Sequence, residues 1–279
     1  MLKVLKSGFY TSVQDLGRFG YRNKGVPVSG VMDHISVKKA NSLLENKVTD
    51  AVLEITMTGP TLIFEKSTSI VMAGASMSVT LNNEPVRNYK IYQVHEGDIL
   101  SYGKLNKGFR AYLAIKGGFT TNEVLSSRSF YIPITQVNRL KDGDSIPYDG
   151  YADFIPKISE IKTDSFLDET ILEVYKAPEF DLLDDRQLES LFSKDFTISK
   201  QNNRMAYQLK ENIVGLEYSM LTSATLPGTV QLTPSGRLIV LMKDGQTTGG
   251  YPRILQLSDK AISILAQKRE GNNVSFKLI

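Results

Sequence analysis

The sequence predicts a mainly β protein with a few short helices. Its apolar runs are short, rich in β-branched residues and bounded by Gly, Asn, Asp or Pro. Several alternate with period two, which is typical of half-buried strands. Their close spacing between turn signals favours a sandwich or barrel. The clearest runs are residues 52–56, 69–73, 109–115, 171–175, 237–242 and 274–278.

Three short acidic-glycine segments punctuate these runs. They are Glu96-Gly-Asp98, Asp142-Gly-Asp144 and Glu270-Gly-Asn272, each just before a strand-like segment. We expect hairpin turns with positive φ at each glycine.

Three helices are expected, all short. Asp33 is a good N-cap for a helix that runs to about Asn46. The other two are predicted over residues 184–192 and 258–267.

The chain is predicted to divide into two halves, residues 1–160 and 161–279, because residues 149–170 are charged, interrupted by Pro156 and without clear periodicity. Arg18-Phe-Gly-Tyr21 is echoed by Arg204-Met-Ala-Tyr207. The echo indicates two related β-barrel halves, with a chance match of four residues as the alternative.

Composition excludes several functional classes. The 279 residues include no cysteine and two histidines, His34 and His95, so disulfides, thiolate chemistry and most zinc sites are excluded, and no metal site is predicted. The formal charge of +3 is too small to predict binding to nucleic acid or to an anionic membrane. Without an apolar run of signal-peptide or membrane-span length, we expect a cytoplasmic protein.

Two glycine-rich polar stretches carry the functional signal. The first is Val13-Gln-Asp-Leu-Gly-Arg-Phe-Gly-Tyr-Arg22, continuing through Gly25-Val-Pro-Val-Ser-Gly-Val-Met-Asp33, and the second is Asp244-Gly-Gln-Thr-Thr-Gly-Gly-Tyr-Pro-Arg253. Such mixtures are costly in a packed core but suit loops that approach a polar ligand. We expect the two stretches to converge on one polar cleft.

The first stretch offers an amide, two carboxylates, a hydroxyl and a guanidinium. The alternative is a structural turn in which the charged groups bind each other or the backbone, with Asp33 as a helix cap. The candidates are Gln14, Asp15, Arg18, Ser29 and Asp33.

The second stretch follows a strongly apolar strand, so it emerges where ligand loops are commonly displayed. Its alternative is a plain β-hairpin with an Asp-Gly turn. Residues 201–205 form a third, weaker element that is equally compatible with a solvated loop. The candidates are Asn203, Arg204, Asp244, Gln246, Thr247, Thr248, Gly249, Gly250 and Tyr251.

These motifs resemble one family. Besides the two stretches, the resemblance includes Ala40-Asn41, Leu53-Glu-Ile55, Gly59-Pro60 and Asn203-Arg-Met205. The family is that of the biotin-dependent carboxyltransferases, also called allophanate hydrolase subunit 2, which includes the C subunit of 5-oxoprolinase, the Kip-inhibitor antagonist and the carboxyltransferase half of urea carboxylase. The resemblance covers essentially the whole chain and implies cyclophilin-like β-barrels in both halves.

For a chain of this length, the resemblance implies the C subunit of a 5-oxoprolinase, which acts in a hetero-oligomer with subunits B and A. That complex opens 5-oxoproline to L-glutamate at the expense of ATP, whose site lies on a partner or is shared with one. An unstrained lactam is a poor electrophile, and phosphorylation of its carbonyl oxygen would provide a leaving group. The isolated chain is expected to be inactive.

The resemblance also implies residue roles. Arg18 or Arg204 would hold the substrate carboxylate, and Gln246, Thr247 and the backbone of Gly249 and Gly250 would contact lactam or phosphoryl oxygens. Any of Asp15, Asp33 and Asp244 would move a proton, and the sequence leaves open which one.

Two other functions are implied by branches of the same family. One is a regulatory protein that binds and neutralises a kinase inhibitor and catalyses nothing. The other is carboxyl transfer from biotin to a urea-like amide, which requires biotin on a carrier chain.

Overall fold

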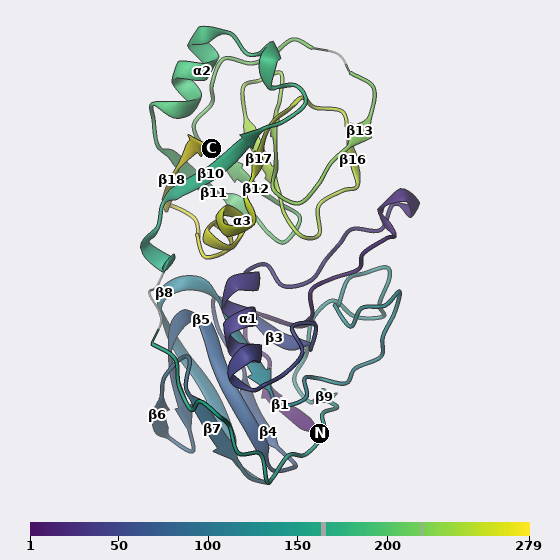
Figure 1. The fold of residues 1–279 in the computed structure, drawn as a ribbon, viewed down its shortest axis with the longest axis vertical. Helices are drawn as coiled ribbons and strands as arrows, with labels where there is room; N and C mark the ends of the chain where they lie inside the picture. Colours follow the sequence, from purple (N-terminus) through teal and green to yellow (C-terminus); the bar gives the residue numbers. More distant parts are fainter. Residues whose placement is uncertain (163–165, 219) are drawn as a thin grey trace. The chain divides into compact units, whose positions relative to one another are not determined.

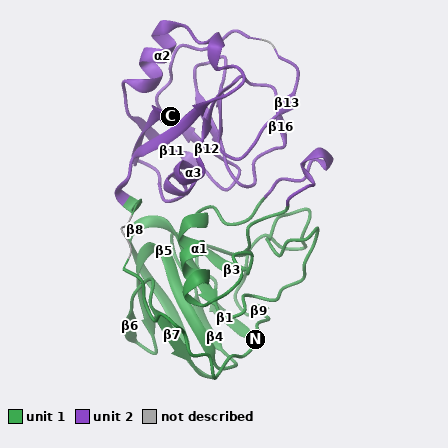
Figure 2. Ribbon diagram, viewed as in Figure 1, with its two compact units in different colours: residues 1–18, 29–167 green, residues 19–28, 168–279 purple. Residues whose placement is uncertain are grey.

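The computed structural model describes residues 1–162, 166–218 and 220–279, which form two compact units. Unit 1 contains Met1–Arg18 and Ser29–Leu167, and unit 2 contains Phe19–Val28 and Asp168–Ile279 (Figure 2). The chain therefore passes into unit 2 at Phe19 and returns at Ser29, within the first polar stretch. The later division, at residues 167 and 168, falls in the segment where the sequence predicts a boundary, but a single division at 160 does not describe the early excursion.

Unit 1 is built on a nine-stranded antiparallel sheet (Figure 1). Its path is β2-β3-β8-β4-β1-β9, and β5 pairs with β6, β7 and β8. The strands are β1 (Leu2–Lys6), β2 (Tyr10–Gln14), β3 (Val52–Thr56), β4 (Thr61–Phe64), β5 (Thr68–Leu81), β6 (Glu84–Val86), β7 (Ile91–Val94), β8 (Ile99–Ile115) and β9 (Ser145–Ile146).

Strands β5 and β8 are much longer than the apolar runs that predicted them. They pair from Ile70 with Ile115 to Leu81 with Leu100, and the register shifts around Gly74, Ser76 and Met77. These irregularities allow polar and glycine residues to continue a strand that sequence patterning ends early. The predicted limits at residues 73 and 109 are therefore wrong.

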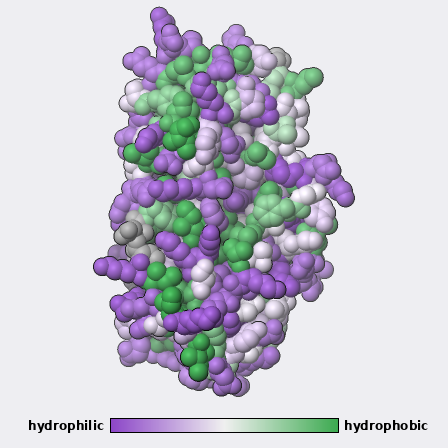
Figure 3. All heavy atoms as spheres, in the orientation of Figure 1, coloured by the Kyte–Doolittle hydropathy of each residue, from purple (hydrophilic) through white to green (hydrophobic). Residues whose placement is uncertain are grey.

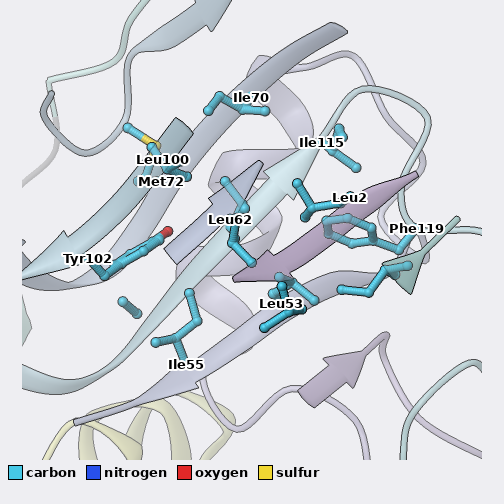
Figure 4. Packing of buried hydrophobic residues seen from close by; sticks show 14 of the residues in the cluster. Leu2, Leu53, Ile55, Leu62, Ile70, Met72, Leu100, Tyr102, Ile115 and Phe119 are labelled. Atoms are coloured by element: carbon cyan, nitrogen blue, oxygen red, sulfur yellow. The ribbon is translucent and has the colours of Figure 1, made fainter. Parts of the chain in front are cut away.

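The sheet of unit 1 buries both faces. Along β5, Ile70 and Met72 join one apolar cluster, while Val71 and Ala73 join another. The first cluster, partly drawn in Figure 4, gathers side chains from β1, β3, β4, β5 and β8. The second lies under helix α1 (His34–Leu43), whose buried residues include Val37, Ala40 and Leu43. Alternation along the strand thus distributes side chains between two cores.

Unit 2 is a closed seven-stranded barrel with the order β10-β17-β14-β15-β12-β11-β18. All pairings are antiparallel except that of β10 with β18. A small separate sheet pairs β13 (Ser223–Ala224) with β16 (Thr248–Gly249). The barrel strands are β10 (Ile171–Lys176), β11 (Phe196–Asn202), β12 (Ala206–Leu209), β14 (Thr229–Leu232), β15 (Leu238–Leu241), β17 (Arg253–Leu257) and β18 (Asn273–Leu278).

The three predicted helices are confirmed, and local capping explains each start. Asp33 caps α1 by accepting from the Ser36 N–H, and Asp184 forms a capping box with Gln187 before α2 (Asp185–Phe192). Ser258 caps α3 (Asp259–Ala266). Short 3₁₀ turns occupy Arg22–Lys24, Phe166–Asp168 and Phe180–Leu182.

The positive φ predicted at three turn glycines is confirmed, but the turns are not hairpins, because none of them joins two strands that pair with each other. Gly97, Gly143 and Gly271 have φ of 88°, 87° and 83°, and β8, β9 and β18 follow shortly after them. The mainly β class is confirmed, with a closed barrel in unit 2 and a half-barrel in unit 1. In the part of the chain that the structure describes, no helix has the length and apolar character to cross a membrane.

Apolar residues at the surface lie in small groups separated by hydrophilic ones on the face drawn in Figure 3. By contrast, the ring of Phe196 in unit 2 is fully buried. Its centroid lies 5.5 Å from the centroid of the Phe276 ring.

Phe196→Ala is expected to destabilise the protein by about 3–5 kcal/mol, because it removes a fully buried ring and leaves a cavity. The matched control is Phe9→Ala, whose ring is 57% exposed and should contribute less than about 0.5 kcal/mol. Denaturant unfolding of both variants measures the difference, and equal losses would contradict this account of the core.

Candidate functional site

The carboxylate of Asp15 lies at the centre of a hydrogen-bonded junction at the end of β2. Its Oδ1 accepts from the Gly17 N–H at 2.8 Å, from Ser127 Oγ at 2.7 Å and from Ser129 Oγ at 2.6 Å. Its Oδ2 accepts from the Arg128 N–H at 2.6 Å. Four donors saturate this carboxylate, so it fixes the segment at residues 127–129 to the first polar stretch.

Arg18 holds the same segment. Its guanidinium is fully buried and donates to the carbonyl oxygens of Val124, at 3.2 Å from Nε, and of Ser129. Gln14 is fully buried beside it and donates to Ser12 Oγ at 3.0 Å and to the Phe130 carbonyl at 3.2 Å. For residues 14–18, these contacts agree with the alternative interpretation, a structural turn in which the charged groups bind the backbone.

The returning part of the stretch has a constrained backbone. Ser29 adopts a φ of 55°, and a Cβ on Gly30 would lie 2.6 Å from the Leu16 carbonyl carbon, so residues 29–30 pack tightly on the Asp15 loop. The Ser29 hydroxyl is buried and has no hydrogen-bond partner among the described residues. Asp33 accepts from the Ser36 N–H at 3.0 Å and from Ser36 Oγ at 2.7 Å, which is its capping role.

A buried polar network holds the backbone at Met32 and Asp33, just after the chain returns to unit 1. Glu54 Oε2 accepts from the Met32 N–H at 2.8 Å and from the Tyr112 hydroxyl at 3.0 Å, and that hydroxyl accepts from the Asp33 N–H at 2.9 Å. Burial, followed by the charge of Glu54, raises the pKa of Tyr112 well above its ordinary value. Arg110 Nε lies 3.8 Å from Glu54 Oε1. Glu54, Met32 and Asp33 fall in motifs that the sequence brought out, whereas Tyr112 and Arg110 do not.

The second polar stretch does not form a plain hairpin. It connects β15 to β17, and in the barrel these strands are separated by β14. The hairpin alternative is therefore wrong, and the loop crosses the end of an intervening strand.

Asp244, at the start of this loop, is paired with Arg204. Arg204 Nε donates to Asp244 Oδ2 at 2.8 Å and Nη2 donates to Oδ1 at 3.1 Å, with the Arg204 side chain 7% exposed. Asn203 Oδ1 accepts from the N–H groups of Met205 and Ala206, which closes the turn between β11 and β12. Each of the two charged groups therefore already neutralises the other.

Two glutamine amides flank Gly249 further along the loop. A Cβ at Gly249 would lie 2.5 Å from Nε2 of the buried Gln231 and 3.3 Å from Nε2 of Gln246. Thr225 holds the loop from the other side, since its Oγ1 donates to the Gln246 carbonyl at 2.5 Å and its N–H donates to the Thr247 carbonyl at 3.1 Å. Glycine at 249 thus lets the backbone pack closely against two side-chain amides.

Arg22 brings the middle of the first polar stretch to this loop within unit 2. Its Nη2 donates to the Thr225 carbonyl and, at 3.5 Å, to the Thr247 carbonyl. Its Nη1 is buried and has no hydrogen-bond partner among the described residues. Burial lowers the pKa of Arg22 from its ordinary value, because a charge away from water is less stable without a counter-ion.

These residues form a donor-rich site, here called the Arg22 cluster: Arg22, Thr225, Gln231, Gln246, Thr247 and Gly249. A guanidinium nitrogen and side-chain amides suit a planar carboxylate or amide. Sequence reasoning selected Gln246, Thr247 and Gly249 but missed Arg22, Thr225 and Gln231. The only sequence signal for Arg22 was its place in the first polar stretch, at the end of the segment Val13–Arg22.

The other predicted residues of the loop lie around the cluster. Thr248, Gly250 and Tyr251 are exposed, and the Tyr251 carbonyl accepts from Gln231 Nε2 at 3.4 Å. Arg253 ends the loop by binding Glu179, with Nε to Oε2 at 2.8 Å and Nη2 to Oε1 at 2.7 Å. Its Nη1 donates to the Ala224 carbonyl beside Thr225 at 2.5 Å.

Comparison with known proteins places the chain in a family. The family described as "Carboxyltransferase domain, subdomain A and B" matches residues 24–278. The chain belongs to this carboxyltransferase family. The match includes the loop that Arg22 contacts in the barrel and most of unit 1.

Relatives of this carboxyltransferase-family chain have enzyme names. It is 31% identical to the 5-oxoprolinase C subunit of Escherichia coli, covering 99% of this chain and 90% of the relative. It is 30% identical to the 5-oxoprolinase C subunit of Haemophilus influenzae, covering 100% and 91%. The solved structure of K. lactis urea amidolyase matches with a TM-score of 0.88 and 28% identity over 99% of this chain, which spans 18% of that protein.

Gly249→Ala is expected to displace the Gln231 amide, because the added Cβ would lie 2.5 Å from Gln231 Nε2. The displaced amide is buried and would lose its hydrogen-bonded position, which should lower the free energy of unfolding by about 1–3 kcal/mol. Gly250→Ala is the matched control, since a Cβ there meets nothing within 4 Å. Thermal unfolding compares the two variants, and equal stability of both would contradict the close packing at Gly249.

Glu179 should make the free energy of unfolding decrease as the pH falls into the acid range. Hydrogen bonds from Arg253 lower the pKa of Glu179, so its contribution is present above the ordinary glutamate pKa and is lost as the pH falls through the lowered value. Glu179→Gln should cost about 1–3 kcal/mol at pH 7 and progressively less below about pH 4. Unfolding measured at pH 7 and pH 3 tests this, and an equal cost at both would contradict it.

Proposed function

We propose that this chain is the C subunit of an ATP-dependent 5-oxoprolinase, which opens 5-oxo-L-proline to L-glutamate together with subunits B and A. The supporting observation is full-length similarity to two proteins named as 5-oxoprolinase C subunits. The family and the fold alone do not distinguish this function from that of the urea amidolyases, which the chain also resembles.

The chemistry of the Arg22 cluster suits this substrate. 5-Oxoproline carries a carboxylate and a lactam, which need a cation and amide-type hydrogen-bond partners. Arg22 Nη1 supplies a buried cationic donor, and the amides of Gln231 and Gln246 lie on either side of Gly249. In the proposal Arg22 binds the carboxylate, while the glutamine amides and Thr247 align the lactam.

The roles predicted for Arg18 and Arg204 are reassigned in this proposal. Arg18 is fully buried and donates to two backbone carbonyls, and Arg204 is paired with Asp244. Arg22 also donates to two carbonyls, but it is only partly buried and contacts the second polar stretch at Thr247. The predicted proton-transfer role of Asp15, Asp33 or Asp244 stays a prediction. Each of these carboxylates accepts hydrogen bonds from groups of this chain. This chain contributes binding and orientation to the complex.

ATP would be consumed by the assembled complex. In the proposal its site lies on a partner protein or is shared with one, and its chemistry is activation of the lactam carbonyl. A cluster that holds the lactam in one orientation would support that activation by positioning the substrate.

The direct test is ATP-dependent glutamate release from 5-oxoproline by this chain reconstituted with its B and A partners. Activity should vanish when this chain is omitted. Full turnover by the partners alone would contradict the proposal, as would carboxylation of a urea-like amide from a biotin carrier in place of glutamate release.

Arg22→Gln should reduce kcat/KM for 5-oxoproline by about 100-fold or more, because a buried charged hydrogen bond to the carboxylate is lost. Arg186→Gln, at an exposed position of α2, is the control and should retain wild-type kinetics. Wild-type kcat/KM in Arg22→Gln would remove Arg22 from the substrate site.

A further inference from the structure

A second surface lies in unit 1 and involves neither polar stretch. It is a cavity of about 300 Å³ between the turn at residues 7–9 and the segment at residues 139–142. We name it the Phe9 pocket, defined by its lining residues: Ser7, Gly8, Phe9, Arg139, Leu140, Lys141 and Asp142.

The walls of the Phe9 pocket are fixed by hydrogen bonds. The Ser7 N–H donates to Asp142 Oδ1 at 2.8 Å, and the Leu140 N–H donates to the Thr11 carbonyl at 2.8 Å. Gly8 has a φ of 73°, and a Cβ there would lie 2.3 Å from the Thr58 carbonyl oxygen. The pocket is therefore preformed.

Apolar side chains are exposed in and beside this pocket. Phe9 is 57% exposed, and its N–H donates to the carbonyl of Thr58, next to Met57, which is 40% exposed. Val137, 41% exposed, adjoins Asn138, whose carbonyl accepts from the Tyr10 hydroxyl. Large exposed apolar groups around a preformed concavity are typical of interaction sites.

The lining of the pocket carries more positive than negative charge. Arg139 and Lys141 line it, and in residues 1–162, 166–218 and 220–279 neither side chain forms a hydrogen bond or an ion pair. The one acidic lining residue, Asp142, is occupied by the Ser7 N–H. Two cations beside an exposed aromatic ring complement a carboxylate next to an apolar side chain.

We propose that the Phe9 pocket docks an acidic segment of a partner protein, with an apolar side chain of that segment against Phe9 and a carboxylate at Arg139 and Lys141. A protein segment is favoured over a small anion because an anion alone would leave Phe9, Met57 and Val137 exposed. The partner is another component of the same enzyme, so this inference rests on the proposed function.

The test measures binding of the full-length chain to its B and A partners by titration calorimetry. Phe9→Ala and the double variant Arg139→Glu with Lys141→Glu should each weaken binding about tenfold or more. Added salt should weaken wild-type binding more than that of the charge-reversal variant. The controls are Tyr175→Ala, an exposed ring on β10, and Arg186→Glu, both of which should bind like the wild type.

Turnover separates the two proposals. The pocket variants should recover wild-type kcat once the partners are in excess, because docking and not chemistry is altered. Wild-type affinity in both pocket variants, with intact turnover, would overturn the docking site and leave the proposed function standing. If the wild-type chain neither binds the partners nor supports turnover, both proposals are overturned.

Discussion

One partly buried guanidinium, that of Arg22, joins the first polar stretch to the loop between β15 and β17 in unit 2. Arg22 donates to the carbonyl oxygens of Thr225 and Thr247, and it does so because the chain leaves unit 1 at Phe19 and returns at Ser29. This excursion places a cation from the first motif beside the amide-lined Gly249. A carbonyl binds one side of a guanidinium but does not neutralise it, so the remaining buried nitrogen favours an anionic or strongly dipolar ligand.

The rest of the first motif has a different physical role. Asp15 and Arg18 bind the segment at residues 124–129, and Glu54 with Tyr112 fixes the return at Met32 and Asp33. Burying these charged groups is costly unless every one is hydrogen-bonded. Most of the charged groups of the motif thus hold the two ends of the excursion, whereas Arg22, within the excursion, keeps one buried nitrogen that has no hydrogen-bond partner among the described residues.

Local signals made much of the fold predictable. The caps at Asp33, Asp184 and Ser258 and the positive-φ glycines act within a few residues, so the sequence pattern contains them. Strands β5 and β8 were underestimated because Gly74, Gly103 and Gly108 look like ends of strands, whereas the pairing continues through them. In the candidate site, Gln246, Thr247 and Gly249 were predictable from their loop. Arg22 was not, because its partner Thr225 lies 203 residues away in the sequence.

In the proposed function, Arg22 and the amides beside Gly249 hold the substrate. The decisive measurement is a crystal structure of the reconstituted complex with 5-oxoproline. We expect the carboxylate of the ligand within hydrogen-bond distance of Arg22 Nη1 and its lactam against Gln231 or Gln246. A ligand bound to other residues, with no contact to Arg22, would rule out this substrate site.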